Sequence, residues 1–199
     1  ANGKTKRVLF SGDLGNYDRE FSPHGNPITN PKLLINAIFC ETTYGGTLRD
    51  PQYYVEGLGK FKEDVGLELH KGKTIIIPSF AMDRSQELLY HLRDITGSKI
   101  YYDTKSGNLI LPIYQHSNKL YKEAKLNFIP INCENRDEVY GNSSAKIIVT
   151  SSGMCNGGPI NEYLNLFLED EEAVFMLTGY MSPNTIGGKL YHGSKKIYL

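Results

Sequence analysis

Hydrophobic residues along this chain form short continuous runs that alternate with longer amphipathic stretches. The clearest run is Thr74–Ile77, which is mostly β-branched and has no polar alternation. A strand of this kind is covered on both faces, as in a parallel sheet. Pro78 ends the run, and three leucines of the next stretch lie on one helical face. These are Leu88, Leu89 and Leu92. We therefore predict a strand that leads directly into a helix.

The turn between this strand and this helix carries polar residues. Ser79 and Asp83 are candidate helix caps. Arg84 would lie in the first helical turn, where a cation opposes the helix dipole. We therefore expect Arg84 to face an anion or to pair with a carboxylate, for which Glu41 and Glu87 are the candidates.

The same alternation continues along the whole chain. Strands are predicted at 7–10, 33–40, 99–102, 146–150, 173–177 and 195–199, and helices at 50–69, 109–124 and 160–168. In the first helix, apolar residues recur at steps of three or four. They are Tyr54, Leu58, Phe61, Val65 and Leu69. Residues 16–32 are predicted to be a surface loop, and 128–144 a loop with one short extended piece. This order predicts an α/β fold with a three-layer αβα arrangement, a mainly parallel sheet and its functional turns at the carboxyl edge.

Composition narrows the possible environments and partners. The chain has 199 residues, of which 40% are hydrophobic and 22% charged, as in ordinary soluble proteins. Its 22 basic and 22 acidic residues cancel, so any nucleic-acid contact must be a local patch. No run has the length of a membrane span, and the start has no secretion signal. Because Met is absent at position 1, we expect a piece of a longer protein.

The cysteines favour a reducing, cytoplasmic setting. Cys40, Cys133 and Cys155 lie far apart and form no CxxC pair. This spacing argues against a disulfide framework and against a cysteine-based zinc site.

Two predicted strands end in an acidic residue. The first runs into SGDLG with Asp13, and the second into ETTYGG with Glu41. The carboxyl ends of strands in α/β folds are where ligand chemistry is found. On spacing alone, SGD is also an ordinary turn, and that interpretation is favoured for this motif by itself.

A glycine-rich turn, SSGMCNGGP, follows the strand predicted at 146–150. Its small residues and backbone amides precede a helix, which is a natural place for a phosphate, with Ser151, Ser152 and Gly153 as candidates. Glycines that merely permit tight packing are the equally supported alternative. Arg84, Lys105 and Lys189 could add a phosphate-contacting strip, although a lone cation is commonly a solvated surface residue.

Tyrosines and histidines are given structural roles. We expect packing for the tyrosines on predicted strands and helices, which are Tyr53, Tyr54, Tyr101, Tyr102 and Tyr163. The histidines are scattered and are expected to be surface or cap residues. They are His24, His70, His91, His116 and His192.

Five motifs in order, SGDLG, ETTYGG, IIIPSFAMDRSQELL, VTSSGMCNGGP and TGYMSPNTIGGKL, resemble the β-CASP group of metallo-β-lactamase-fold nucleases. The resemblance covers nearly the whole chain. It implies RNA processing, or DNA processing as in some relatives, by an enzyme whose β-CASP domain is inserted into an αββα metallo-β-lactamase domain. Two zinc ions lie between the two domains in that group.

The resemblance also implies roles for individual residues. Asp13 matches an aspartate that bridges the two zinc ions, and Glu41 matches an acidic residue that supports the neighbouring histidines. Residues 1–45 would be the end of the first metallo-β-lactamase segment, and 46–199 the β-CASP domain. Asp83 and Asn184 stand where glycine is usual, and Asn tolerates a left-handed backbone better than most residues.

The HxHxDH zinc motif of that group is not present in these 199 residues. We therefore expect that the chain alone binds no zinc tightly at Asp13 and hydrolyses no RNA, and that its partners are the missing metallo-β-lactamase segments and single-stranded RNA. The expected function is the substrate-clamping part of a zinc-dependent ribonuclease. The alternative is a non-catalytic RNA-binding or scaffold subunit, and a homodimer stays open. A Rossmann-like nucleotide site is disfavoured because no GxGxxG or GxxxxGK[ST] motif occurs.

Overall fold

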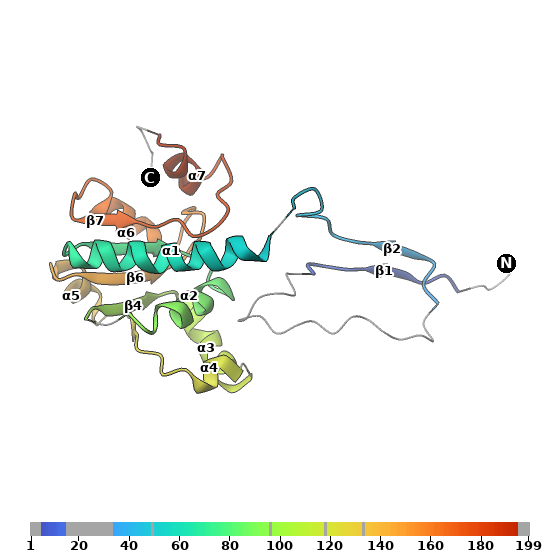
Figure 1. The fold of residues 1–199 in the computed structure, drawn as a ribbon, viewed down its shortest axis with the longest axis horizontal. Helices are drawn as coiled ribbons and strands as arrows, with labels where there is room; N and C mark the ends of the chain where they lie inside the picture. The colour runs from blue at the N-terminus through green and yellow to red at the C-terminus, as the bar shows by residue number, and fades with distance from the viewer. Residues whose placement is uncertain are drawn as a thin grey trace. The chain divides into compact units, whose positions relative to one another are not determined.

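The computed structural model describes residues 5–14, 34–48, 50–95, 97–117, 119–132 and 134–194. They divide into two units, Ala1–Gly57 and Leu58–Leu199. In the first unit, strands β1 (Val8–Phe10) and β2 (Ala37–Phe39) pair in parallel (Figure 1). The rings of Phe10 and Phe39 stack with their centroids 4.9 Å apart.

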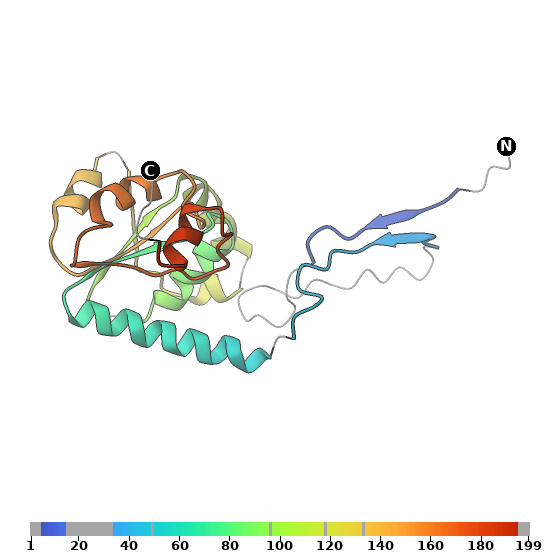
Figure 2. The same ribbon diagram turned by 90° about the horizontal axis from the view of Figure 1, so that it is seen from above.

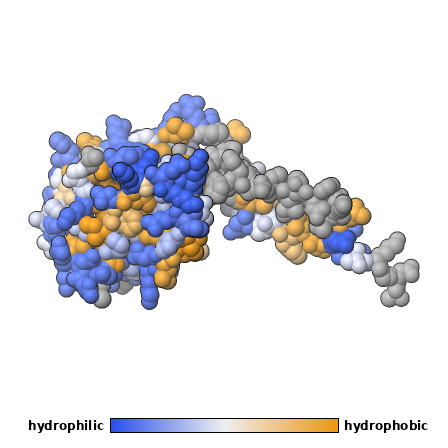
Figure 3. All heavy atoms as spheres, turned by 90° about the horizontal axis from the view of Figure 1, so that it is seen from below, coloured by the Kyte–Doolittle hydropathy of each residue, from blue (hydrophilic) through white to orange (hydrophobic). Residues whose placement is uncertain are grey.

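The strands of the first unit are exposed, although their apolar sequences predict burial. Phe10 is 70% exposed, Ile38 61% and Phe39 61%. Figure 3 shows hydrophobic residues on the surface of this unit. A two-stranded sheet has two open faces, and no helix among the described residues of this unit covers them. The apolar sequence pattern is typical of parallel strands that are covered on both faces. The structure leaves these strands exposed, so the prediction of burial is wrong for them.

The second unit contains a five-stranded sheet in the order β5-β4-β6-β3-β7, with every pair parallel. Its strands are β3 (Thr74–Pro78), β4 (Lys99–Asp103), β5 (Ile129–Pro130), β6 (Lys146–Thr150) and β7 (Ala173–Phe175). Every residue of β3 and β6 is buried. The continuous apolar runs therefore become the central strands, which confirms the predicted parallel sheet.

Helices cover both faces of this sheet. The part of α1 (Pro51–His70) that lies in the second unit, together with α2 (Arg84–Leu92), is on one face, and α5 (Arg136–Gly141) and α6 (Ile160–Phe167) are on the other (Figures 1 and 2). The remaining helices are α3 (Lys105–Ser117), α4 (Lys119–Glu123) and α7 (Ile186–Tyr191). The three-layer αβα fold is thus confirmed. None of the helices within the described ranges is long and apolar enough to cross a membrane.

The hydrophobic core has its centre on the sheet. Ile76, Tyr101 and Ile148 point to the α5–α6 side and pack with Val139 and Leu164. On α1, the five positions of the predicted apolar face are buried or partly buried, and Val65 is completely buried. Tyr53 in the same helix is 74% exposed, so the packing predicted for this tyrosine is wrong.

Several boundaries differ from the sequence prediction. Strand β2 begins at Ala37 rather than at 33, and β7 ends at Phe175. The helix expected at 109–124 is two helices, α3 and α4, and starts at Lys105. Helix α5, in the expected loop, and helix α7 were missed because six residues are too few to show a repeating apolar period. The predicted loop at 16–32 and the last strand at 195–199 lie outside the described residues.

Replacing a central core residue tests this arrangement. Ile148→Ala in β6 removes buried methyl groups from a side chain with no exposed area, and we expect it to lower the free energy of unfolding by about 2–5 kcal/mol. The measurement is urea unfolding followed by circular dichroism. The control Ile113→Ala removes a 62% exposed side chain and should change the value by at most about 0.5 kcal/mol. Equal effects of both variants would contradict the assigned core.

Candidate functional site

The two acidic residues singled out in the sequence follow neighbouring strands of the first unit. The Ser11 amide donates to the Phe39 carbonyl at 2.9 Å, and the Glu41 amide donates to Ser11 Oγ at 2.9 Å. These bonds join the turn that contains Asp13 to the turn that contains Glu41. Gly12, between Ser11 and Asp13 in the first of these turns, has a φ of 58°, a left-handed conformation that favours glycine.

The Glu41 carboxylate holds the two turns together. Its Oε2 accepts the Thr43 amide at 2.8 Å, and its Oε1 accepts the Leu14 amide at 3.4 Å. The hydrogen bonds from Thr43, with a smaller contribution from Leu14, lower the pKa of Glu41. Glu41 is therefore an anion that orders the turns, whereas the Asp13 side chain is exposed.

The ligands for a metal are incomplete in the described part of the chain. No group of three His, Cys, Asp or Glu side chains comes together there. One exposed carboxylate does not make a site for two zinc ions, which need several imidazoles and carboxylates. The described residues therefore do not fit a dizinc centre by themselves.

The described histidines and cysteines do not add up to a metal site. His70, His116 and His192 are exposed as expected, but His91 is only 5% exposed, because α2 is buried from Ser85 to Leu92. The prediction of a surface or cap role is therefore wrong for His91. Cys40 is exposed and Cys155 is buried, and both are free thiols. His24 and Cys133 lie outside the described residues.

In the second unit, the turns after β3, β6 and β7 meet at the carboxyl edge of the sheet. The Ser79 amide donates to the Thr150 carbonyl at 2.8 Å. A Cβ at Gly153 would lie only 2.8 Å from the Phe80 amide nitrogen, so the first two turns touch where only glycine fits. The Gly187 amide donates to the Met154 carbonyl at 3.0 Å, which brings in the start of α7, directly after the third turn. The predicted alignment of these turns is therefore present.

Ser151 and Ser152 offer hydroxyls rather than amides at this edge. Their amides donate to the carbonyls of Asp103 and Gly157, both at 3.3 Å, so the expected free amides are wrong for these two residues. Their side-chain hydroxyls bond to no other residue within the described part of the chain. Helix α6 starts only at Ile160. These hydroxyls are thus groups of this turn that could bind an external phosphate.

The three candidate cations differ in their surroundings. Arg84 Nη1 donates to Glu87 Oε2 at 2.7 Å, which confirms the structural alternative for this residue. A guanidinium has five N–H donors, so this contact leaves others for a ligand. Lys105 at the start of α3 and Lys189 in α7 are exposed. A phosphate role for these cations stays a prediction.

The two departures from glycine have different explanations. Asp83 has a φ of 63°, a backbone conformation that glycine adopts without strain, and its carboxylate accepts from Tyr114 Oη at 2.9 Å. Asp83 precedes α2 but makes no side-chain cap bond, so its predicted capping role is wrong, as it is for Ser79, whose hydroxyl donates to the Phe80 carbonyl. Asn184 does not have a positive φ, so the argument from left-handed backbone fails there.

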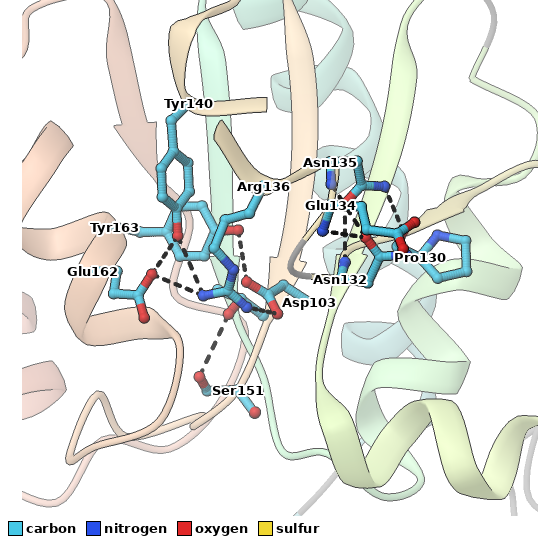
Figure 4. A network of polar contacts seen from close by, with 11 residues as sticks. Asp103, Pro130, Asn132, Glu134, Asn135, Arg136, Tyr140, Ser151, Glu162 and Tyr163 are labelled. Atoms are coloured by element: carbon cyan, nitrogen blue, oxygen red, sulfur yellow. Dashed lines mark hydrogen bonds and ion pairs between the residues drawn. The ribbon is translucent and has the colours of Figure 1, made fainter. Parts of the chain in front are cut away.

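Asp103 is a buried carboxylate beside the glycine-rich turn that the sequence pattern did not indicate as a site residue. Asp103 ends β4 and is only 3% exposed. Its Oδ2 accepts from Tyr163 Oη at 2.8 Å, and its Oδ1 accepts from Arg136 Nη2 at 3.0 Å (Figure 4). Because its carbonyl also binds the Ser151 amide, Asp103 connects α5 and α6 to the turn.

The network continues outward from Arg136 to the surface. Glu162 Oε2 accepts from Tyr140 Oη at 2.6 Å and from Arg136 Nη1 at 2.7 Å. Burial raises the pKa of Asp103, although the bonds from Tyr163 and Arg136 oppose this effect. The bonds from Tyr140 and Arg136 lower the pKa of Glu162. Only the strand-end position of Asp103 could have suggested it, since its two partners are 60 and 33 residues away in sequence.

Comparison with known proteins gives consistent matches. The model of the Beta-Casp domain family matches residues 85–190. The chain is 31% identical to the Probable RNase MJ4 of Methanocaldococcus jannaschii, over 96% of this chain and 48% of that protein. It is 26% identical to Ribonuclease TTHA0252 of Thermus thermophilus (96% and 47%) and 27% identical to Transcription termination factor FttA of Methanosarcina mazei (96% and 32%). The chain thus spans about half the length of the first two relatives, and less of the third.

Asp103→Asn tests the buried network. The amide keeps the size of the side chain but loses the charge and one acceptor, so we expect the free energy of unfolding to fall by about 1–3 kcal/mol. Chemical denaturation measures the change. Asp94→Asn is the matched control, because Asp94 is 64% exposed and lies 3.5 Å from Arg93, and its loss should cost at most about 1 kcal/mol. An Asp103→Asn variant with an unchanged free energy of unfolding would show that the network does not stabilise the fold.

Glu162 should make stability depend on pH. Its pKa is lowered in the folded protein, so its contribution to stability is complete above the ordinary value of 4.5 and is lost as pH falls through the lowered pKa. The melting temperature of the parent protein should fall as the pH is lowered from 5. We expect a smaller fall for Glu162→Gln, and thermal unfolding at a series of pH values measures both. Parallel curves for the variant and the parent would refute the assignment.

Proposed function

The chain belongs to the Beta-Casp domain family, and from this premise we propose that it is the substrate-clamping part of a zinc-dependent ribonuclease. Two relatives that match 96% of the chain are named as ribonucleases, which supports RNA as the substrate. Because the chain spans about half of each of them, the catalytic machinery is assigned to the longer protein.

The observation that carries this proposal is the junction of three turns at the carboxyl edge of the sheet. Single-stranded RNA lies along this edge, and the hydroxyls of Ser151 and Ser152 bind a backbone phosphate. Gly153 lets the turn approach the segment after β3. Lys105 and Lys189 supply exposed positive charge that attracts the phosphates. The remaining donors of Arg84 could bind there as well.

We assign Asp13 as one zinc ligand of the complete protein and Glu41 as the anion that fixes the neighbouring turn. The zinc ions would supply Lewis-acid chemistry for phosphodiester hydrolysis. Their other ligands come from metallo-β-lactamase segments beyond residues 1–45, while 46–199 form the β-CASP domain. The exposed apolar faces of β1 and β2 support this, because those segments would cover them. The working environment is the cytoplasm.

A second candidate function is a non-catalytic RNA-binding or scaffold subunit of an RNA-processing complex. It is favoured by the relative from Methanosarcina mazei, whose name describes a transcription termination factor rather than a ribonuclease. The same edge of the sheet would bind RNA in both cases. The two functions differ in whether the full-length protein cuts the RNA that it binds.

Cleavage of RNA by the full-length protein separates these functions. We expect it to cut a 5′-labelled single-stranded RNA, to lose this activity with a chelator and to regain it with zinc. Asp13→Ala should lower the rate at least about 100-fold, as expected when a catalytic metal ligand is lost. The 199-residue chain alone should bind the RNA in a salt-dependent way without cutting it.

Asp50→Ala is the control for this experiment, since Asp50 is an exposed carboxylate of the same unit whose bonds to other described residues go to the start of α1. It should leave the cleavage rate unchanged. RNA binding without any metal-dependent cleavage by the full-length protein would reject the nuclease and support the second function. Cleavage by the 199-residue chain alone would contradict the assignment of the catalytic machinery to the missing segments.

A further inference from the structure

We propose that Phe80 is a base-stacking residue, whose ring holds an unpaired nucleobase beside the phosphate bound by the Ser151–Gly153 turn. The proposal rests on the proposed function and adds to it a residue and a mode of recognition. It starts from the exposure of Phe80, which is 50% although the residue follows the central strand β3.

Two other aromatic residues close to this sheet edge, Tyr102 and Tyr163, are buried and have assigned partners, whereas Tyr180 in the turn after β7 is 70% exposed. Tyr102 is fully buried, and its hydroxyl bonds to Ser85 Oγ at 2.7 Å and Gln86 Nε2 at 2.8 Å. Tyr163 is also fully buried and donates to Asp103. Phe80 has no polar atom that could explain an exposed position. Half of the surface of this residue therefore stays in contact with water unless a ligand covers it.

The backbone of Phe80 is held firmly, so its ring can act as a pre-organised platform. The Phe80 carbonyl accepts the Ser85 amide at 3.2 Å and the Ser79 hydroxyl at 3.3 Å. The preceding Ser79 amide binds the Thr150 carbonyl. An aromatic side chain on a fixed backbone has only two torsions to restrict, so little entropy is lost when a base stacks on it.

The ring lies directly beside the candidate phosphate-binding turn. A Cβ at Gly153 would be 3.2 Å from Phe80 Cδ2, which is tighter than an ordinary contact. Gly153 therefore leaves the space in which the ring edge meets the turn. The hydroxyls of Ser151 and Ser152 precede it in the same turn. A phosphate on the serines and its neighbouring base on Phe80 would come from one nucleotide segment.

The geometry favours single-stranded RNA over other partners. Stacking on an aromatic ring needs an exposed base face, and only unpaired bases offer one. The exposed Lys105 and Lys189 at this edge complement phosphates. An apolar protein segment would cover the ring equally well, but it would leave the serine hydroxyls and these lysines without a partner.

The test separates the contribution of the base from that of the phosphate. The full-length protein is titrated with labelled oligoadenylate of 12 nucleotides and with an abasic ribose-phosphate oligomer of the same length. We expect Phe80→Ala to weaken binding of oligoadenylate about tenfold and to leave the abasic oligomer unchanged. Phe80→Leu should behave like Phe80→Ala, and Phe80→Trp should bind as tightly as the parent.

Tyr53→Ala is the matched control, because Tyr53 is a 74% exposed aromatic residue of α1. It should change neither affinity. If Phe80→Ala does not fold, as judged by circular dichroism, the Leu and Trp variants decide. Equal weakening of binding for both oligomers, or no weakening for oligoadenylate, would overturn the stacking role. Neither result would reject the proposed RNA-clamping function. Failure of the parent protein to bind either oligomer would instead reject RNA clamping itself, and the stacking role with it.

Discussion

The burial of both faces of β3 and β6 is the constraint on which the second unit depends. All residues of these two strands are buried, so each face of the sheet must carry a layer of helices. Parallel strands with helical connections bring all their carboxyl ends to one edge. The turns that could bind a ligand are therefore neighbours in space as a result of core packing, even though they lie far apart in the sequence.

The close contacts at this edge depend on small residues and on one buried acid. Gly153 lets the turn after β6 touch Phe80, and Gly187 lets the start of α7 approach Met154. Asp103 connects the turn after β6 to α5 and α6. Its burial is unfavourable for a charge, and bonds from a tyrosine and an arginine offset this cost. The edge is thus ordered by the fold before any ligand binds.

The sequence allowed the fold of the second unit to be predicted, because long apolar runs and a helical apolar face such as that of α1 depend on local pattern. Helix α5 has one buried residue, Val139, and so gave no period. The exposure of β1 and β2 could not be foreseen, since their apolar residues indicate a covering layer that the described residues of that unit lack. Among the site residues, the strand ends located Glu41 and the serines. The roles of Asp103 and Phe80 depend on contacts between distant segments, which no local pattern reports.

Hydrogen exchange on binding of RNA tests the central claim most directly. The account predicts that single-stranded RNA slows amide exchange in peptides that contain residues 79–84, 151–158 and 180–188, all at the carboxyl edge of one sheet. Peptides at the opposite edge, such as 70–74 and 142–146, should exchange as before. Protection confined to the opposite edge, or to the helices away from these turns, would contradict the assignment of this edge as the RNA-binding surface.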